Sequence, residues 1–136
     1  MKKFSFALLT LVIIFAVTPA CKKSSGGGGS SEATLVVETT PANGSNNLNI
    51  LGPDFPLKVE IKSTMPASGV KIEITATKDG SSDPAFFTSN NNSTAPQNNY
   101  TITNTPSAVT CIVNIKVTSI SNNSNTWAGS YRYSKK

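Results

Sequence analysis

Apolar and polar residues alternate along two consecutive segments of this chain. In residues 55–62 every odd position is apolar, and every even position after Pro56 carries a charge. Residues 70–77 show the same alternation, and a turn-forming Met-Pro-Ala-Ser-Gly sequence separates the two segments. A period of two places one face of a β-strand against a core and the other face in water. Both segments are therefore predicted to be half-buried strands, which pair as a hairpin.

Five further segments have strand-like patterns between clusters of Pro, Gly, Asn and Ser: residues 34–39, 86–89, 100–104, 108–119 and 127–133. No segment shows the 3.6-residue apolar period of an amphipathic helix. Short strands separated by turns, about seven in roughly 105 residues, are typical of an antiparallel sandwich with Greek-key connections. The sequence therefore predicts one all-β domain over residues 34–136.

The first 21 residues break this pattern. Lys2 and Lys3 precede an apolar run at positions 6–17, which only Thr10 interrupts, and a small residue stands before Cys21. The run is shorter than the roughly 20 apolar residues that cross a bilayer. A charged start followed by a short apolar stretch is typical of a secretory signal.

The same segment resembles a bacterial lipoprotein signal, in which the cysteine is acylated and cleavage occurs before it. Ala20 and Cys21 fit the pattern of that family, whereas Thr18 and Pro19 depart from its usual residues. The resemblance implies that residues 1–20 are a signal peptide. It also implies that Cys21 carries fatty acyl chains such as palmitate, which anchor the protein in a membrane. An ordinary secretory signal, with Cys21 as a bystander, is the alternative.

Residues 22–31 contain only Lys, Ser and Gly. Such a segment has no apolar side chain to bury and behaves as a flexible coil, with an r.m.s. reach of roughly 17 Å for ten residues. We therefore predict that residues 21–33 are a lipidated cysteine and a Gly/Ser tether, which favours the lipoprotein signal over an ordinary one. Because Lys22 is not the Asp of inner-membrane retention signals, the outer membrane is favoured over the inner membrane.

A segment after the first predicted strand resembles the opening of bacterial immunoglobulin-like domains. Residues 39–47 read Thr-Thr-Pro-Ala-Asn-Gly-Ser-Asn-Asn and match the pattern T-x-P-A-N-G-x-x-N of those domains. Pro fixes φ and Asn-Gly tolerates the left-handed region, so this segment is expected to leave an edge strand rigidly. The resemblance implies an all-β, antiparallel immunoglobulin-like β-sandwich of about seven strands. The tether and the Asn/Ser/Thr-rich composition also resemble small envelope lipoproteins of Bacteroidota.

Charge and composition exclude several classes of function. The chain has 12 Lys and Arg, 7 Asp and Glu, and no His. The cations are scattered among Ser, Thr and Asn and form no basic stripe, so nucleic acid is not an expected partner. Without His there is no Ser-His-Asp triad, Cys-His pair or imidazole metal site. We therefore predict no catalytic residue, no cofactor and no enzyme activity.

The acidic residues and the second cysteine offer few alternatives. A glycosidase needs two carboxylates across a cleft, but Glu60 and Glu73 lie at outward strand positions beside lysines, where cross-strand ion pairs are expected. Asp79 and Asp83 lie in a predicted loop and are weak candidates for Ca²⁺ ligands. An Asp-Gly turn explains the same sequence, so no metal is predicted. Cys111 lies on the apolar face of its strand and is expected to be a buried, unreactive thiol.

Aromatic residues are the remaining lead. Trp127, Gly129, Tyr131 and Tyr133 share one face of the last predicted strand. If that face points outward, Trp127, Tyr131 and Tyr133 form a platform on which the apolar faces of sugars stack. If it points inward, the same rings close the core, as is normal for partly buried Tyr and Trp. We favour the inward orientation.

Together these features predict a non-catalytic, lipid-anchored protein of the cell envelope that acts as a binding, adhesion or spacer module. Its expected partners are the membrane, through the lipid anchor, and an envelope protein or a glycan. The alternative is a carbohydrate-binding accessory lipoprotein that uses the aromatic residues of the last strand.

Overall fold

The computed structural model describes residues 31–136, without the side chains of residues 47–49. The predicted signal peptide (1–20), Cys21 and residues 22–30 of the predicted tether lie outside this range. The described residues form these eight strands: β1 (Val37–Thr40), β2 (Asn46–Ile50), β3 (Phe55–Ile61), β4 (Val70–Lys78), β5 (Phe87–Ser93), β6 (Gln97–Ile102), β7 (Thr110–Ser119) and β8 (Thr126–Lys135). Over residues 31–136 there is no helix long and apolar enough to cross a membrane.

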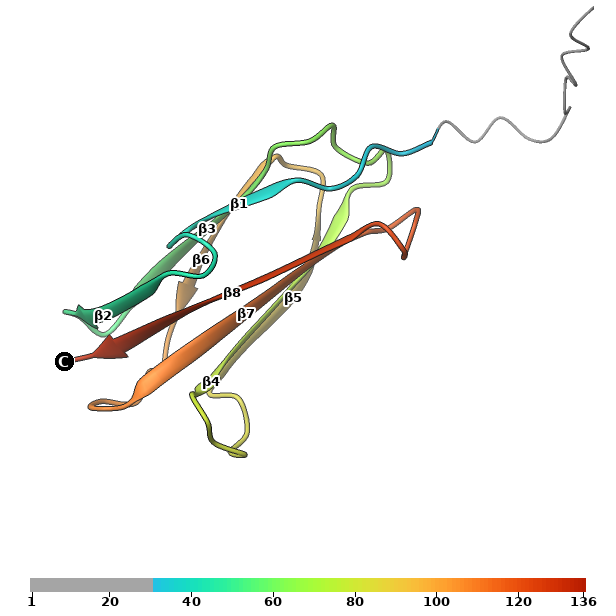
Figure 1. Cartoon of the computed structure of the whole chain (residues 1–136). Helices are drawn as coiled ribbons and strands as arrows, with labels where there is room; N and C mark the ends of the chain where they lie inside the picture. The colour runs from blue at the N-terminus through green and yellow to red at the C-terminus, as the bar shows by residue number, and fades with distance from the viewer. Residues whose placement is uncertain (1–30) are drawn as a thin grey trace, which may run out of the picture.

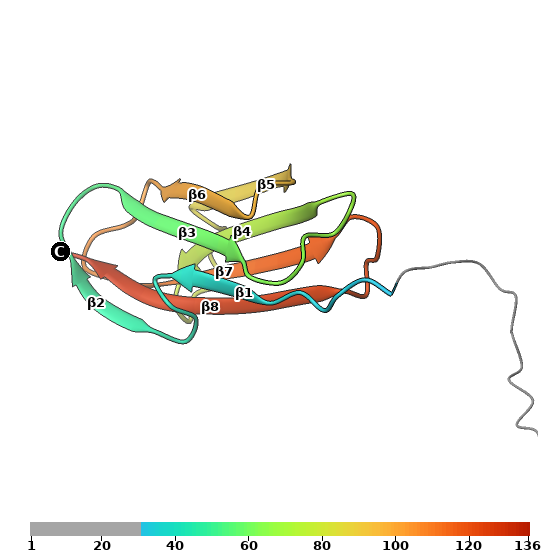
Figure 2. The same ribbon diagram turned by 90° about the horizontal axis from the view of Figure 1, so that it is seen from above.

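Two sheets pack face to face as a β-sandwich (Figures 1 and 2). One sheet has three strands in the order β1-β3-β6, and the other has five strands in the order β2-β8-β7-β4-β5. Neighbouring strands are antiparallel except β2 and β8, which run parallel. A sheet centred on β4, β7 and β8, facing a sheet of β1, β3 and β6, is the arrangement of immunoglobulin-like sandwiches. The predicted all-β sandwich of two packed sheets is confirmed.

The core lies between the sheets and consists of the alternating apolar positions. In β3 and β4 the apolar residues that the period of two assigns to one face are buried, and the same holds for β7. Each strand thus turns one face inward and leaves Lys, Glu, Thr and Ser on the other. The pattern of the sequence predicted the buried face of these strands correctly.

The predicted hairpin between residues 55–62 and 70–77 is wrong. β3 pairs with β1 and β6, whereas β4 pairs with β5 and β7 in the other sheet. The connection between β3 and β4 therefore crosses from one sheet to the other. Alternation identifies the face that a strand buries but not its neighbour, and consecutive strands also bury their apolar faces when they pack across the interior.

The sequence predicts about seven strands and misses β2. This strand reads Asn-Asn-Leu-Asn-Ile and is rich in Asn, which is depleted in strands. Its conformation comes from pairing with the backbone of β8. The Arg132 N–H donates to Ser45 O at 2.9 Å, and the Lys136 N–H donates to Ile50 O at 3.4 Å.

The chain changes sheets between β1 and β2. The Ser45 N–H donates to Ala42 O at 3.0 Å and closes a turn in which Gly44 has φ +77°. Asn43 Oδ1 accepts from the Ser130 N–H at 2.8 Å, and the Gly44 N–H donates to Ser130 O at 2.7 Å. The turn is therefore fixed to β8, and residues 39–47 form the rigid exit from an edge strand that the sequence predicts.

The described chain begins at the end of the sandwich opposite the C-terminus, where Asn125 holds it (Figure 2). Asn125 Nδ2 donates to Glu32 Oε1 at 2.6 Å and to Ala33 O at 2.9 Å. Asn125 Oδ1 accepts from the Leu35 N–H at 2.9 Å, and Ser121 Oγ donates to Glu32 Oε2 at 2.7 Å. Because Asn125 is only 8% exposed, one largely buried amide attaches the N-terminal segment to the turn between β7 and β8.

Replacing Asn125 with Ala removes both ends of this amide and leaves the buried Leu35 N–H without its acceptor. We expect the free energy of unfolding to fall by about 2 kcal/mol, because an unsatisfied buried group costs roughly 1–3 kcal/mol. Asn123→Ala, in the same turn but exposed, is the control and should change stability by less than about 0.5 kcal/mol. Urea unfolding measures both variants, and equal stabilities would contradict the role of Asn125.

Candidate functional site

The aromatic residues of β8 face the interior of the sandwich. Tyr131 and Tyr133 are 2% and 0% exposed, and Trp127 is partly buried against the core. The Trp127 indole lies over Gly129, where an added Cβ would overlap with the ring. These rings therefore take the inward orientation that the sequence favours, and they do not form an exposed platform.

Tyr131 and Tyr133 line an apolar cleft of about 410 Å³, which we call the distal cleft. Its other apolar walls include Pro41, Ile50 and Phe55. The Phe55 and Tyr133 rings are stacked obliquely, with centroids 4.5 Å apart, and the Tyr131 and Tyr133 centroids are 6.0 Å apart. Trp127 is not part of this lining, so the structure brings together two of the three predicted ligand-binding residues.

The strand segments that supply the lining of the distal cleft lie in the half of the sandwich that contains the C-terminus (Figure 2). This lining comes from the ends of β1, β2 and β8, from the start of β3, and from Asn99 and Tyr100 of β6. The residues that Asn125 attaches, from Glu32 onward, lie at the opposite end. We call the contacts of Asn125 with residues 32–35 the N-terminal junction. The cleft and the N-terminal junction are therefore at opposite ends of the long axis of the domain.

The cleft opens where β1 stops pairing with β3. Thr40 is the last residue of β1 in this register and lies opposite Lys58, whereas β6 remains paired with β3 as far as Phe55. Residues 55–57 of β3 thus have a paired strand on one side only, because the chain leaves the sheet at Pro41. The change of sheet by the N-terminal strand creates the opening.

The two tyrosine hydroxyls at the cleft have different surroundings. Tyr133 Oη forms a 2.7 Å hydrogen bond with Thr105 Oγ1. Tyr131 Oη is buried and has no hydrogen-bond partner within the described protein. Burial raises the pKa of Tyr131, and it raises the pKa of Tyr133 to about 12. Both phenols therefore stay neutral at ordinary pH, and that of Tyr131 is an unused donor and acceptor.

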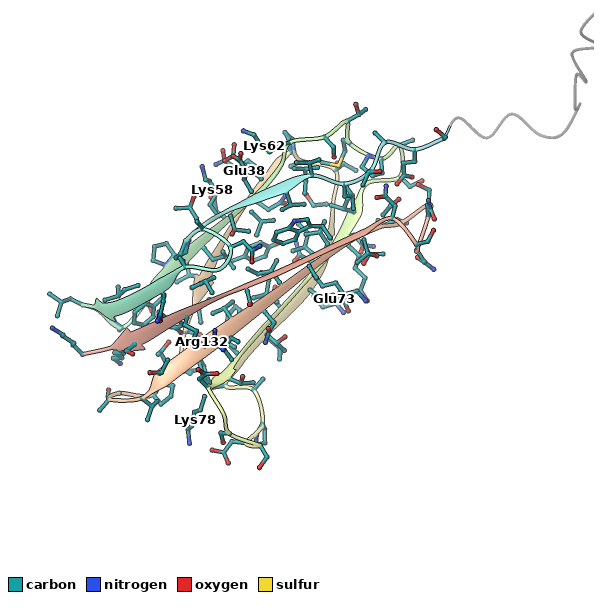
Figure 3. The ribbon with its side chains drawn as sticks, viewed as in Figure 1. Glu38, Lys58, Lys62, Glu73, Lys78 and Arg132 are labelled. Carbon is teal, nitrogen blue, oxygen red and sulfur yellow. The ribbon has the colours of Figure 1, made fainter. Side chains whose placement is uncertain are left out.

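Glu60 and Glu73 lie at outward strand positions beside lysines, and no carboxylate lines the distal cleft (Glu73 is labelled in Figure 3). Lys58 Nζ is 2.7 Å from Glu60 Oε2, and Lys71 Nζ is 2.8 Å from Glu73 Oε1. Hydrogen bonds from Lys58 and Lys71 hold the pKa values of Glu60 and Glu73 below their usual range. Carboxyl groups with lowered pKa values are poor proton donors near neutral pH.

The close contacts of these two ion pairs join residues two apart on the same strand, not residues on neighbouring strands as predicted. For Glu73 the cross-strand neighbour Lys116 also lowers the pKa, after the Lys71 hydrogen bond.

For Glu60 the cause of the same-strand pairing is its cross-strand neighbour, because Glu38 lies directly opposite and has the same charge. Lysines at Lys58 and Lys62 of its own segment are therefore its partners. Lys62 also reaches across to Glu38 at 3.6 Å, so one cation contacts both carboxylates.

Asp79 and Asp83, the weak Ca²⁺ candidates, do not converge. Asp79 Oδ2 accepts from Arg132 Nε at 2.7 Å, whereas Asp83 Oδ2 accepts from Lys78 Nζ at 2.8 Å. The Lys78 hydrogen bond lowers the pKa of Asp83. In the part of the chain that the structure describes, no three Cys, Asp or Glu side chains gather around a metal-sized space. The two carboxylates instead pair with separate basic side chains, Arg132 and Lys78, near the turn between β4 and β5 (Figure 3).

Cys111 is a buried thiol, as predicted. Its side chain is inaccessible to solvent, and Sγ lies 3.9 Å from Val109 O. Burial raises the pKa of this thiol, so it stays protonated and packs as a small apolar group.

Sequence reasoning missed the contributions of Pro41, Ile50 and Tyr100 to the cleft. One signal was present: proline has no N–H for a sheet ladder, so Pro41 ends β1. The alternation of β3 already begins at Phe55. A short β1 beside a longer β3 leaves part of β3 without a neighbour on one side, although the sequence does not say which strand the chain joins next.

Neither a scan against protein-family models nor a search of curated proteins finds a match to this chain. The features that bear on function are therefore the distal cleft and the pattern of the first 21 residues.

Two conservative substitutions test whether the Tyr131 and Tyr133 hydroxyls contribute differently to stability. Tyr131→Phe removes a buried group without a partner and should raise the free energy of unfolding by about 1 kcal/mol. Tyr133→Phe leaves the buried Thr105 hydroxyl without its partner and should lower it by about 1 kcal/mol. Urea unfolding measures both changes. A loss of stability in Tyr131→Phe equal to that in Tyr133→Phe would mean that the Tyr131 hydroxyl is satisfied.

Acid is expected to weaken the N-terminal junction. Hydrogen bonds from Ser119, Ser121 and Asn125 lower the pKa of Glu32. A carboxyl with a lowered folded pKa stabilises the fold above about pH 4.3, and this contribution is lost as pH falls through the folded pKa. Thermal midpoints measured between about pH 6 and about pH 3 should fall less steeply for Glu32→Gln than for the natural protein. Parallel pH profiles would contradict the contribution of Glu32.

Proposed function

We propose that this protein is a non-catalytic, lipid-anchored module of the bacterial cell envelope, held in the outer membrane, that binds a partner at the distal cleft. The position of the cleft is the observation that carries this proposal. The lining residues of the cleft come from the end of β1, the end of β2, the start of β3 and the C-terminal half of β8, and these segments lie in the half of the sandwich away from residue 31 (Figure 2). A chain anchored at Cys21 presents that half away from the membrane.

Dimensions support this arrangement. β8 contains 10 residues and runs from the N-terminal junction to the cleft. At about 3.3 Å per residue it spans roughly 33 Å. The tether adds an r.m.s. reach of roughly 17 Å. The cleft therefore stands roughly 50 Å from the anchoring lipid when tether and domain are aligned, clear of the headgroups.

The chemistry of the described residues favours binding over catalysis. The lining of the distal cleft contains no Asp, Glu, Cys or Ser. Outside it, Glu60, Glu73 and Asp83 have lowered pKa values and contact lysines. A general acid needs a raised pKa and a nucleophile needs an activating base. These side chains supply neither.

The cleft also bears on the carbohydrate alternative. The three rings that the sequence named for sugar stacking are not exposed, because Tyr131 and Tyr133 are buried and Trp127 packs on Gly129. An apolar partner suits the distal cleft better than a glycan.

The anchor is tested on the full chain in a Gram-negative host supplied with radiolabelled palmitate. The natural protein should incorporate label and sediment with the membranes. Cys21→Ala should lose the label and leave the membrane fraction. Cys111→Ala, which changes the other cysteine, is the control and should keep both properties.

Label retained in Cys21→Ala, or membrane association without any label in the natural protein, would contradict the proposed anchor. Partition of the labelled protein into the outer-membrane fraction of a sucrose gradient tests the proposed location. Recovery in the inner-membrane fraction would overturn that part of the proposal.

A further inference from the structure

We propose that two copies of this protein associate through the free edge of β5, which pairs antiparallel with β5 of the other copy. β5 is the last strand of the five-stranded sheet, and β4 is its neighbour on one side. The inference goes beyond the proposed function, because the residues of β5 do not line the distal cleft. Three properties of β5 support it: an open backbone, the lack of charge, and the fit to an identical strand.

The backbone of β5 is available for pairing on its outer side. All of its residues, Phe87–Ser93, have partners in β4 in an unbroken register. Among residues 31–136, no strand covers the other side of β5, which lies at the margin of the sandwich (Figure 2). Part of its N–H and C=O groups therefore point away from the sheet. Such a row of unpaired groups is complemented by another extended strand.

This edge lacks the features by which proteins usually prevent such pairing, which are charges, Pro and bulges. β5 contains no charged residue, no Pro and no register shift. By contrast, β1 carries Glu38 and is followed by Pro41, and the register of β2 shifts. β5 is also longer than the other edge strands β1, β2 and β6. It is therefore the edge best suited to pairing.

The side chains of β5 indicate a second copy as the partner. Full overlap of two such strands places a two-fold axis at Asn90 and sets Thr88 opposite Asn92 of the other copy. These three side chains are exposed. Amides and hydroxyls both donate and accept hydrogen bonds, so they complement identical groups. An isologous contact would instead set like charges together if the edge were charged.

The neighbouring edge strand β6 is neutral as well. Tyr100 Oη donates to Asn91 Oδ1 at 3.1 Å, so β6 lies beside β5 on this side of the sandwich. No charged residue stands between Asp83 and Lys116 in the sequence, a range that contains both strands. A copy that pairs with β5 therefore meets no charge from either edge, whereas a charged segment of another protein would find no counter-ion there.

Antiparallel pairing fixes the orientation of the two domains. A two-fold axis perpendicular to the strands points their N-terminal ends in opposite directions. With the proposed lipid anchor, the contact joins copies that are held in two facing membranes. This consequence rests on the proposed function, whereas the pairing itself does not.

The test measures the oligomeric state of the soluble fragment of residues 31–136, which contains all eight strands and the whole described core. Sedimentation equilibrium over a range of protein concentrations gives the dissociation constant of the dimer. We expect the natural fragment to form reversible dimers. The double variant Thr88→Lys, Asn92→Lys sets lysine against lysine across the contact and should raise the dissociation constant by more than about tenfold.

A charge exchange tests the register. The double variant Thr88→Lys, Asn92→Glu sets each lysine opposite a glutamate of the other copy and should restore dimers. Thr75→Lys is the matched control, because Thr75 is exposed and lies opposite Thr88 but on the inner strand β4. It should keep the natural dissociation constant. A cooperative thermal transition verifies the fold of each variant.

Vesicles test the orientation. Attached to lipid vesicles through its N-terminus, the natural fragment should cluster them, and light scattering measures the clusters. The double-lysine variant should leave the vesicles separate. Dimers in solution without clustering of vesicles would overturn the contact between facing membranes.

Three results would overturn the pairing of β5: a natural fragment that stays monomeric, a double-lysine variant that dimerises as well as the natural fragment, or a Lys/Glu variant as monomeric as the double-lysine variant. A monomeric fragment whose β5 edge binds an extended peptide of another protein would overturn the second copy as the partner. The palmitate result for Cys21 is independent of these measurements, so the two proposals fail separately.

Discussion

A strand cannot pair fully in two sheets at once. The opening at the C-terminal end of this sandwich depends on that constraint. The first strand begins as β1 beside β3 and continues as β2 beside β8, so the chain crosses between the sheets after Thr40. The crossing leaves residues 55–57 without a neighbour on one side, and the distal cleft opens there. Asn43 and Gly44, which bond to Ser130, hold the crossing on β8. The turn chemistry of one short segment therefore decides where the sandwich is open.

The two ends of the sandwich differ in how well their buried polar groups are satisfied. At the N-terminal junction, Asn125 bonds to Glu32, Ala33 and Leu35, and Ser119 Oγ bonds to the Ser121 hydroxyl and accepts from the Asn122 N–H. At the cleft, Tyr131 Oη has no partner within the described protein. A satisfied network is rigid, whereas an unsatisfied buried group lowers stability. In the proposed anchored module, the satisfied end is the one that faces the tether.

Local patterns and long-range pairing differ in how far the sequence predicts them. Alternation in β3 and β4 identified the buried faces, because the side-chain period depends only on the strand itself. The hairpin between them was wrong and β2 was missed, because pairing depends on partners distant in the chain and Asn-rich β2 is a strand only beside β8. The inward face of Tyr131 and Tyr133 was anticipated, but the cleft was not. A cleft is the absence of a covering strand, and no single segment encodes it.

The most direct test of this account is to locate a bound apolar probe by NMR. In isotope-labelled fragment 31–136 saturated with naphthalene, intermolecular nuclear Overhauser effects report which protons lie near the probe. The account predicts contacts to Pro41, Ile50 and Tyr100, which line the distal cleft. Contacts confined to the outer faces of the sheets, or to the turn around Asn125 at the opposite end, would contradict it.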